Sequence, residues 1–141
     1  MKLTGTKAQQ YLHRARMFRA AASELSDYVN GEQNWPKYAL LTHAIELSLK
    51  AFAEHSIQNG KPHPARRPDN HDLRGWYDVA LQYGLQSEPS VAENVDLLNE
   101  LHKTHYTRYP EDRATVPAAD NIADSTVDHL IFTFTQSINP R

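Results

Sequence analysis

The sequence predicts an all-α protein, a single-domain up-and-down bundle of about five helices spanning residues 1–141. Three observations support this prediction. The segment 36–57 is apolar on most of its circumference at about 100° per residue, and such a helix needs other helices around it. Apolar residues elsewhere recur at helical spacings. No segment shows the alternation of a convincing strand.

The first helix is expected over residues 7–29. Its apolar residues form one seam, because they follow one another at spacings of four and three: Tyr11, Ala15, Phe18, Ala22, Leu25 and Val29. Asn30 and Gly31 come next, and glycine readily adopts the left-handed conformation that stops a helix. We therefore expect this pair to end the helix.

The second helix, over residues 36–57, is expected at the centre of the bundle. Pro36 suits its first turn, where a missing N–H costs no hydrogen bond, and Asn59 and Gly60 follow its end. One polar stripe runs along it: Thr42, His43, Glu46, Lys50 and Glu54. This stripe is expected to meet the connecting segments.

Three further helices complete the predicted bundle. The third begins near Asn70 or His71 and ends at Gly84, and its internal Gly75 is expected to allow the close approach of another helix. The fourth begins with a capping box, Ser90 to Glu93, and the fifth begins near residue 120. The long loops 58–70 and 107–119 are the expected carriers of function.

The composition excludes several classes of function. The chain has no cysteine, so it has no disulfide, thiolate zinc site or cysteine nucleophile. Its net charge of −2 argues against wholesale coating of nucleic acid or of an anionic membrane. No apolar run approaches the ~20 residues of a membrane span, and the N-terminus lacks the apolar centre of a secretory signal. We therefore expect a cytoplasmic protein with no membrane partner.

Three segments together resemble a known family. They are AIELSLKAF at 44–52, NHDL at 70–73 and RYP at 108–110. Their order, spacing and helical context are similar to those of the HEPN superfamily, named for higher eukaryotes and prokaryotes nucleotide-binding. The resemblance covers residues 7–138 and implies a small helical bundle that forms a homodimer.

The resemblance also bears on activity. Many HEPN proteins are metal-independent ribonucleases, often toxins or phage-defence effectors, and use an arginine followed, after four to six intervening residues, by a histidine. No histidine stands at that distance after Arg108 or Arg113, and the only formal match, Arg66 to His71, precedes the third helix. Members without the motif are thought to bind nucleotides, RNA or proteins, and several are encoded beside a nucleotidyltransferase-like partner.

Glu46 and Lys50 lie one turn apart with the acid first, the order that stabilises a helix by about 0.2–0.5 kcal/mol. One interpretation is a solvated or partly buried pair within the helix. The other is that Glu46 anchors the RYP segment through two parallel hydrogen bonds to Arg108.

A basic cluster surrounds the start of the third helix: Arg66, Arg67, His71 and Arg74. Guanidinium groups beside a helix N-terminus favour contact with the phosphate of a nucleotide or RNA. In a divergent ribonuclease, His71 would exchange protons and Arg66 would stabilise the phosphorane charge. The alternative is a solvated loop in which His71 caps the helix.

A second cluster interleaves aromatics with arginines: Tyr106, Arg108, Tyr109 and Arg113. Aromatic rings stack on bases while guanidinium groups hold phosphates; alternatively, Tyr109 fills the core and Arg108 pairs internally. His102 and His105 have helical spacing, but zinc needs a third ligand and histidines at a helix end also interact with the helix dipole. No metal site or cofactor is predicted.

These observations predict a HEPN-like module that binds nucleotide, RNA or a protein partner in a bacterial toxin–antitoxin or defence setting. The setting comes entirely from the resemblance. A divergent metal-independent endoribonuclease is the first alternative, and a purely structural dimerisation module is the second.

Overall fold

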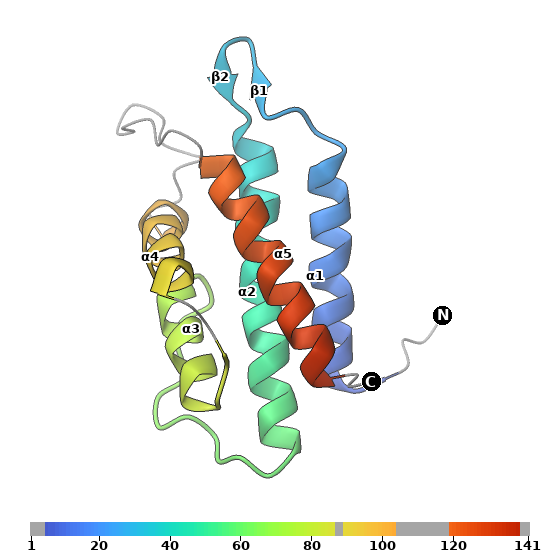
Figure 1. Cartoon of the computed structure of the whole chain (residues 1–141), viewed down its shortest axis with the longest axis vertical. Coiled ribbons are helices and arrows are strands. Elements are labelled where there is room, and N and C mark those ends of the chain that lie inside the picture. Colours follow the sequence, from blue (N-terminus) through green and yellow to red (C-terminus); the bar gives the residue numbers. More distant parts are fainter. Residues whose placement is uncertain (1–4, 87–88, 104–118, 139–141) are drawn as a thin grey trace.

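The computed structural model describes residues 5–86, 89–103 and 119–138, and for residues 32–33, 100–103, 119–124 and 136–138 the description covers the backbone alone. Within these ranges the chain forms five helices that pack into one body (Figure 1). The all-α prediction is confirmed. The helices are α1 (Lys7–Ser23), α2 (Trp35–Gln58), α3 (Leu73–Gln82), α4 (Pro89–Lys103) and α5 (Ala119–Ile138).

Helix α2 is the centre of the bundle, as its apolar circumference predicts. It contacts each of the other four helices. Ile45 and Leu49 are completely buried, and Phe52 is buried against Phe134 of α5 with the ring centroids 5.2 Å apart. None of the helices, as far as the chain is described, combines the length and apolar character that a membrane span requires.

Helices α1 and α5 lie against each other and against α2. Lys7 of α1 pairs with Glu54 near the end of α2, so α1 and α2 are antiparallel. Arg19 of α1 donates two hydrogen bonds to the carboxylate of Asp128 of α5, at 2.7 and 3.2 Å. This bidentate pair and the shared core hold three helices together on one side of the molecule.

Helix α3 runs in the same direction as α2, so the path departs here from simple up-and-down alternation. Asn70 and His71, just before α3, contact the middle of α2, whereas Tyr83 at its far end donates a hydrogen bond to the Pro62 carbonyl, 2.7 Å away, just beyond α2. The connection between the helices therefore doubles back along the bundle (Figure 1). This return path brings residues 66–72 beside the polar stripe of α2.

The predicted end of the first helix is wrong. Helix α1 ends at Ser23, and residues 28–33 form a small antiparallel hairpin of strands β1 (Tyr28–Val29) and β2 (Glu32–Gln33). Asn30 and Gly31 have φ of 53° and 79°, and positive φ at both central residues is typical of the tight turn that Asn-Gly favours. The pair therefore turns a hairpin rather than stopping a helix.

Contacts with the start of α2 explain why the chain leaves the helix early. The ammonium of Lys37 donates to the Leu25 carbonyl and to the Asp27 carboxylate, at 3.1 and 2.7 Å. Asn34 also donates its backbone N–H to the Asp27 carbonyl. These hydrogen bonds require a non-helical path over residues 25–27.

Two other predicted helix starts shift by a short distance. Helix α3 begins at Leu73 with Asp72 as its N-cap, two or three residues later than predicted. Helix α4 begins at Pro89, so Ser90 lies in its first turn and is not the cap of a capping box. Proline is favoured at the first helical position because it lacks the N–H that would have no partner there.

Candidate functional site

An ion pair is buried beneath the loop that precedes α3. The ammonium of Lys50 lies 2.8 Å from a carboxylate oxygen of Glu46, and only 9% and 2% of the two side chains are exposed. Lys50 also donates to the side-chain carbonyl of Asn70, 3.2 Å away. The ion pair within the helix that the spacing predicts is therefore present, and it is more deeply buried than expected.

His71 contacts the same carboxylate. Its Nδ1 lies 3.3 Å from Oε1 of Glu46, while about half of its side chain stays exposed. The helix cap is Asp72, whose carboxylate accepts the backbone N–H of Gly75 at 3.0 Å. The expectation that His71 caps α3 is therefore wrong, because the ring is turned toward α2.

The segments AIELSLKAF and NHDL meet at this point. Asn70 and His71 contact the ion pair, and Asp72 caps α3. The N–H of the buried Leu73 donates to the side chain of Asn99 of α4 at 2.8 Å. Each residue of NHDL therefore has a structural contact, and the segment joins α2, α3 and α4.

Trp76 completes the attachment of this loop. Its indole N–H donates to the Asp69 carbonyl at 3.1 Å. The ammonium of Lys50 lies 5.3 Å from the ring centroid, and the guanidinium of Arg67 lies 4.8 Å from it. Both separations are within the range of cation–π attraction, so the ring holds Arg67 against the surface.

A hollow of about 300 Å³ opens between this loop and the outer side of α3. Gly75 lies at its edge, where a Cβ atom would come within 2.6 Å of an Asp72 oxygen and 2.9 Å of the Pro68 Cβ. The prediction that Gly75 allows another helix to approach closely is wrong, because the groups that approach it are Pro68 of the loop and the cap residue Asp72. The lining residues are Arg66, Arg67, Pro68, Asp69, Asp72, Gly75, Asp78, Val79 and Gln82.

The charges around the hollow are mixed. Arg74 pairs with Asp78 at 3.0 Å and with Asp96 at 2.9 Å. Desolvation acts to lower the pKa of Arg74, but these two carboxylates outweigh it and hold that pKa above its ordinary value. The charge of Arg74 is therefore balanced inside the protein, which favours a structural role.

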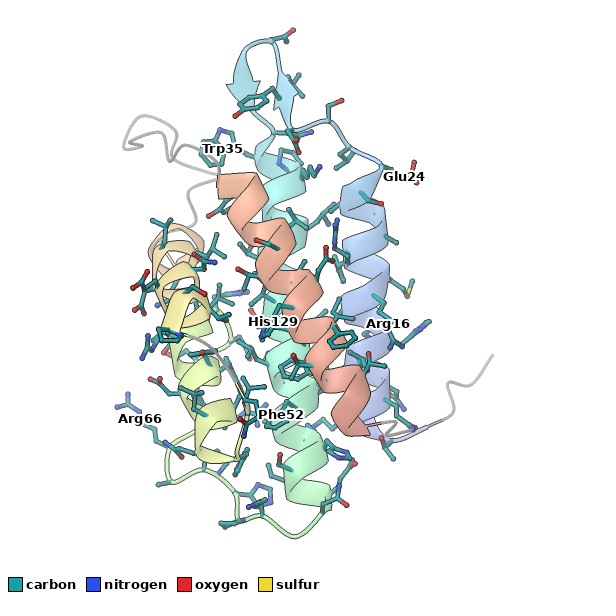
Figure 2. The ribbon with its side chains drawn as sticks, in the orientation of Figure 1. Arg16, Glu24, Trp35, Phe52, Arg66 and His129 are labelled. Carbon is teal, nitrogen blue, oxygen red and sulfur yellow. The ribbon has the colours of Figure 1, made fainter. Side chains whose placement is uncertain are left out.

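Arg66 and Arg67 remain exposed, and within the described chain neither forms an ion pair. Figure 2 shows Arg66 pointing away from the bundle. Its side chain lines the hollow, whereas the ring of His71 contacts Glu46 of α2. Arg66 and His71, which form the formal Arg-to-His match, therefore contact different groups. Arg66 lines the hollow beside α3, and His71 contacts the buried carboxylate of α2.

The second predicted cluster cannot be placed. Tyr106, Arg108, Tyr109 and Arg113 lie outside the described residues, as does His105, and the side chain of His102 is also outside. The proposed anchor between Glu46 and Arg108 therefore stays a prediction, and so does base stacking by these tyrosines.

Sequence reasoning missed two contributors to this site. Trp76 is the first, and its ring contacts Arg67, nine positions earlier. Asn70 was noted only as a helix start, yet it accepts from Lys50, 20 positions earlier. Both residues follow the arginine pair within ten positions, and an amide and an aromatic residue so close to two arginines are the signal that could have found them.

Comparison of the chain with family models, with curated proteins and with solved structures finds no match. The resemblance to the HEPN superfamily therefore rests on the three sequence segments alone. Two of those segments are the ones that meet at the buried ion pair.

Proposed function

We propose that this chain is a HEPN-like binding module that contacts the phosphate of RNA or a nucleotide through Arg66 and Arg67. One observation carries the proposal. The loop bearing these arginines is attached to the buried Glu46–Lys50 pair through Asn70 and His71, and it leaves both guanidinium groups at the surface.

The burial of the pair supports a positioning role for it. Removing two charges from water costs several kcal/mol per ion, which excellent geometry and additional hydrogen bonds must offset. Here the additional partners, Asn70 and His71, both come from the loop. An ordered loop presents its arginines with less loss of conformational freedom on binding.

The arginines themselves have suitable chemistry. Guanidinium groups bind phosphate through paired hydrogen bonds and stay charged at every working pH. Stacking on Trp76 orders Arg67 before any ligand arrives. Because Asp69 and Asp78 line the same hollow, we expect contact with one or two phosphates rather than with a polyphosphate chain.

A binding titration with single-stranded RNA and with nucleoside monophosphates tests the proposal. Two phosphate contacts predict that log K falls with log salt with a slope of about −1.4 for single-stranded RNA. Arg66→Ala should reduce this slope by about 0.7, and Arg66→Ala/Arg67→Ala should abolish the salt dependence.

Arg14→Ala is the matched control, because Arg14 is an exposed arginine on α1, away from the loop. It should leave both the affinity and the slope unchanged. Equal binding by the wild type and the double variant would reject Arg66 and Arg67 as the phosphate contacts.

A metal-independent ribonuclease is the second candidate, favoured by the contact between His71 and Glu46. A buried carboxylate 3.3 Å from Nδ1 can orient an imidazole whose other nitrogen then acts as a base. Cleavage of RNA that persists with chelator and is lost in Arg66→Ala/His71→Ala would support this activity. Equal cleavage by wild type and variant preparations would remove it.

We also propose that the module is a homodimer in a bacterial toxin–antitoxin or defence system, alongside a nucleotidyltransferase-like partner, as the family resemblance implies. Light scattering measures whether the chain is a dimer. Copurification with the product of the neighbouring gene tests for the nucleotidyltransferase-like partner. A stable dimer that binds neither RNA, nucleotide nor protein would favour the remaining alternative, a purely structural module.

A further inference from the structure

A second hollow, of about 210 Å³, lies between α4 and α5. The described residues that line it are all different from those that line the hollow beside Arg66 and Arg67. In Figure 2, His129 lies on the side of α5 that is turned toward α3 and α4. Among the described residues its lining is mixed polar and apolar, with no carboxylate, lysine or arginine: Ser90, Val91 and Asn94 from α4, and Ser125, Thr126 and His129 from α5.

Two polar atoms of this lining are buried without a hydrogen-bond partner. Thr126 is only 2% exposed, and its Oγ1 finds no partner in the structure as described. The same holds for Nε2 of His129, one turn further along α5. Such groups are rare, because leaving one unsatisfied costs about 1–3 kcal/mol.

The first turn of α4 forms the opposite wall. Ser90 and Val91 are the second and third residues of this 15-residue helix. Backbone N–H groups in a first turn have no partner within the helix, and the helix dipole adds positive potential there. One wall thus supplies N–H donors, and the other supplies two side-chain atoms that lack a partner.

We propose that this hollow binds a tetrahedral phosphate group, either as inorganic phosphate or as the end of a larger molecule. The hydroxyl of Thr126 and the Nε2–H tautomer of His129 would donate to its oxygens from one side, and the α4 amides from the other. None of the lining residues that the structure describes is a carboxylate that would repel an anion. The volume lies below the roughly 300–1,000 Å³ of sites for drug-sized ligands, which favours a small group.

The test is an NMR titration of the isotopically labelled chain with inorganic phosphate, at a constant ionic strength set with chloride. We expect the amide signals of Ser90 and Val91 and the ring signals of His129 to shift with one common Kd. A titration to about 10 mM would saturate a site with a Kd near 1 mM. No shift of these signals over that range would overturn the proposal.

Thr126→Val removes the hydroxyl but keeps the shape of the side chain. It should raise the Kd by about tenfold, the effect of losing a hydrogen bond to a charged group, while Thr126→Ser should keep the wild-type value. Thr42→Val is the matched control, because Thr42 is a buried threonine of α2 whose hydroxyl donates to the Ala39 carbonyl. An unchanged Kd in Thr126→Val would also overturn the proposal.

Two further arms separate the possible sources of the phosphate and the two sites. A nucleoside 5′-monophosphate that shifts the same signals at a lower Kd would identify the phosphate as part of a larger ligand, whereas an equal Kd would identify free phosphate as sufficient. Arg66→Ala/Arg67→Ala should leave these shifts unchanged. Loss of the shifts in that variant would assign phosphate to the hollow beside α3 and reject the α4–α5 site.

Discussion

The ammonium of Lys50 lies 2.8 Å from the carboxylate of Glu46, and both groups are enclosed by the bundle and the loop. Glu46→Ala should lower the free energy of unfolding by roughly 3–5 kcal/mol, because it leaves the charge of Lys50 buried with no carboxylate at its side. Urea unfolding followed by far-UV circular dichroism measures this change.

The control for this prediction removes both charges. Glu46→Leu/Lys50→Met should be clearly more stable than Glu46→Ala, since replacing a buried pair with apolar residues of similar volume is often neutral or stabilising. Our interpretation of the pair would be wrong if Glu46→Ala unfolded at the same urea concentration as the wild type.

Gly75 should not tolerate a methyl group, although it lies inside a helix. A glycine-to-alanine change there normally stabilises by about 1 kcal/mol. Here the new Cβ would lie 2.6 Å from an Asp72 oxygen and 2.9 Å from the Pro68 Cβ. Gly75→Ala should therefore destabilise by about 1–3 kcal/mol in urea unfolding, the range for overpacking.

His13→Ala provides the comparison for Gly75→Ala, because His13 lies on the exposed side of α1. This substitution introduces alanine into a helix without a steric conflict, and we expect the free energy of unfolding to change by no more than about 0.5 kcal/mol. A stabilised Gly75→Ala variant would show that the loop moves aside freely.

The hairpin turn makes a prediction about the backbone alone. Gly31 has φ of 79°, and a Cβ placed on it would meet nothing within 4 Å. Gly31→Ala should therefore cost about 1 kcal/mol through left-handed strain only. Gly31→Asn should cost less, because asparagine tolerates this conformation better. Urea unfolding ranks the three proteins, and an equal loss in both variants would contradict this explanation.

Prediction from sequence succeeded where one segment contained enough information. The apolar circumference of residues 36–57 predicts a central helix, and the structure has it at Trp35–Gln58. The predicted end of α1 is wrong because it depends on contacts with another segment. The apolar seam continues through Leu25 and Val29, but Leu25 and Val29 are 37% and 50% exposed because contacts with Lys37 pull the chain away.

The candidate sites depended even more on distant contacts. The spacing of Glu46 and Lys50 predicted an ion pair, but its burial depends on Asn70 and His71 in a loop more than 15 residues away. The hollow lined by Thr126 and His129 had no sequence signal at all. It arises only because the start of α4 packs beside residues 125–129 of α5.

Tyr83 should make stability depend on alkaline pH. Burial, with a smaller contribution from the negative charge of Glu54, raises the pKa of Tyr83 above its ordinary value of 10.0. The folded state therefore holds this proton more tightly than the unfolded state does. The resulting stability is fully present below about pH 10, and it is lost as the pH rises through the folded-state pKa.

Tyr83→Phe separates this effect from other alkaline titrations. At pH 7 it should cost about 1 kcal/mol, because the hydrogen bond to the Pro62 carbonyl at 2.7 Å is lost. Above pH 10 the wild type alone loses the contribution of Tyr83, so the difference between the two proteins should narrow. Tyr28→Phe, at a hairpin residue that is 62% exposed, should follow the wild type throughout. Urea unfolding of the three proteins from pH 7 to about 11 measures the difference, and a gap that widened with pH would mean that the folded state favours the tyrosinate.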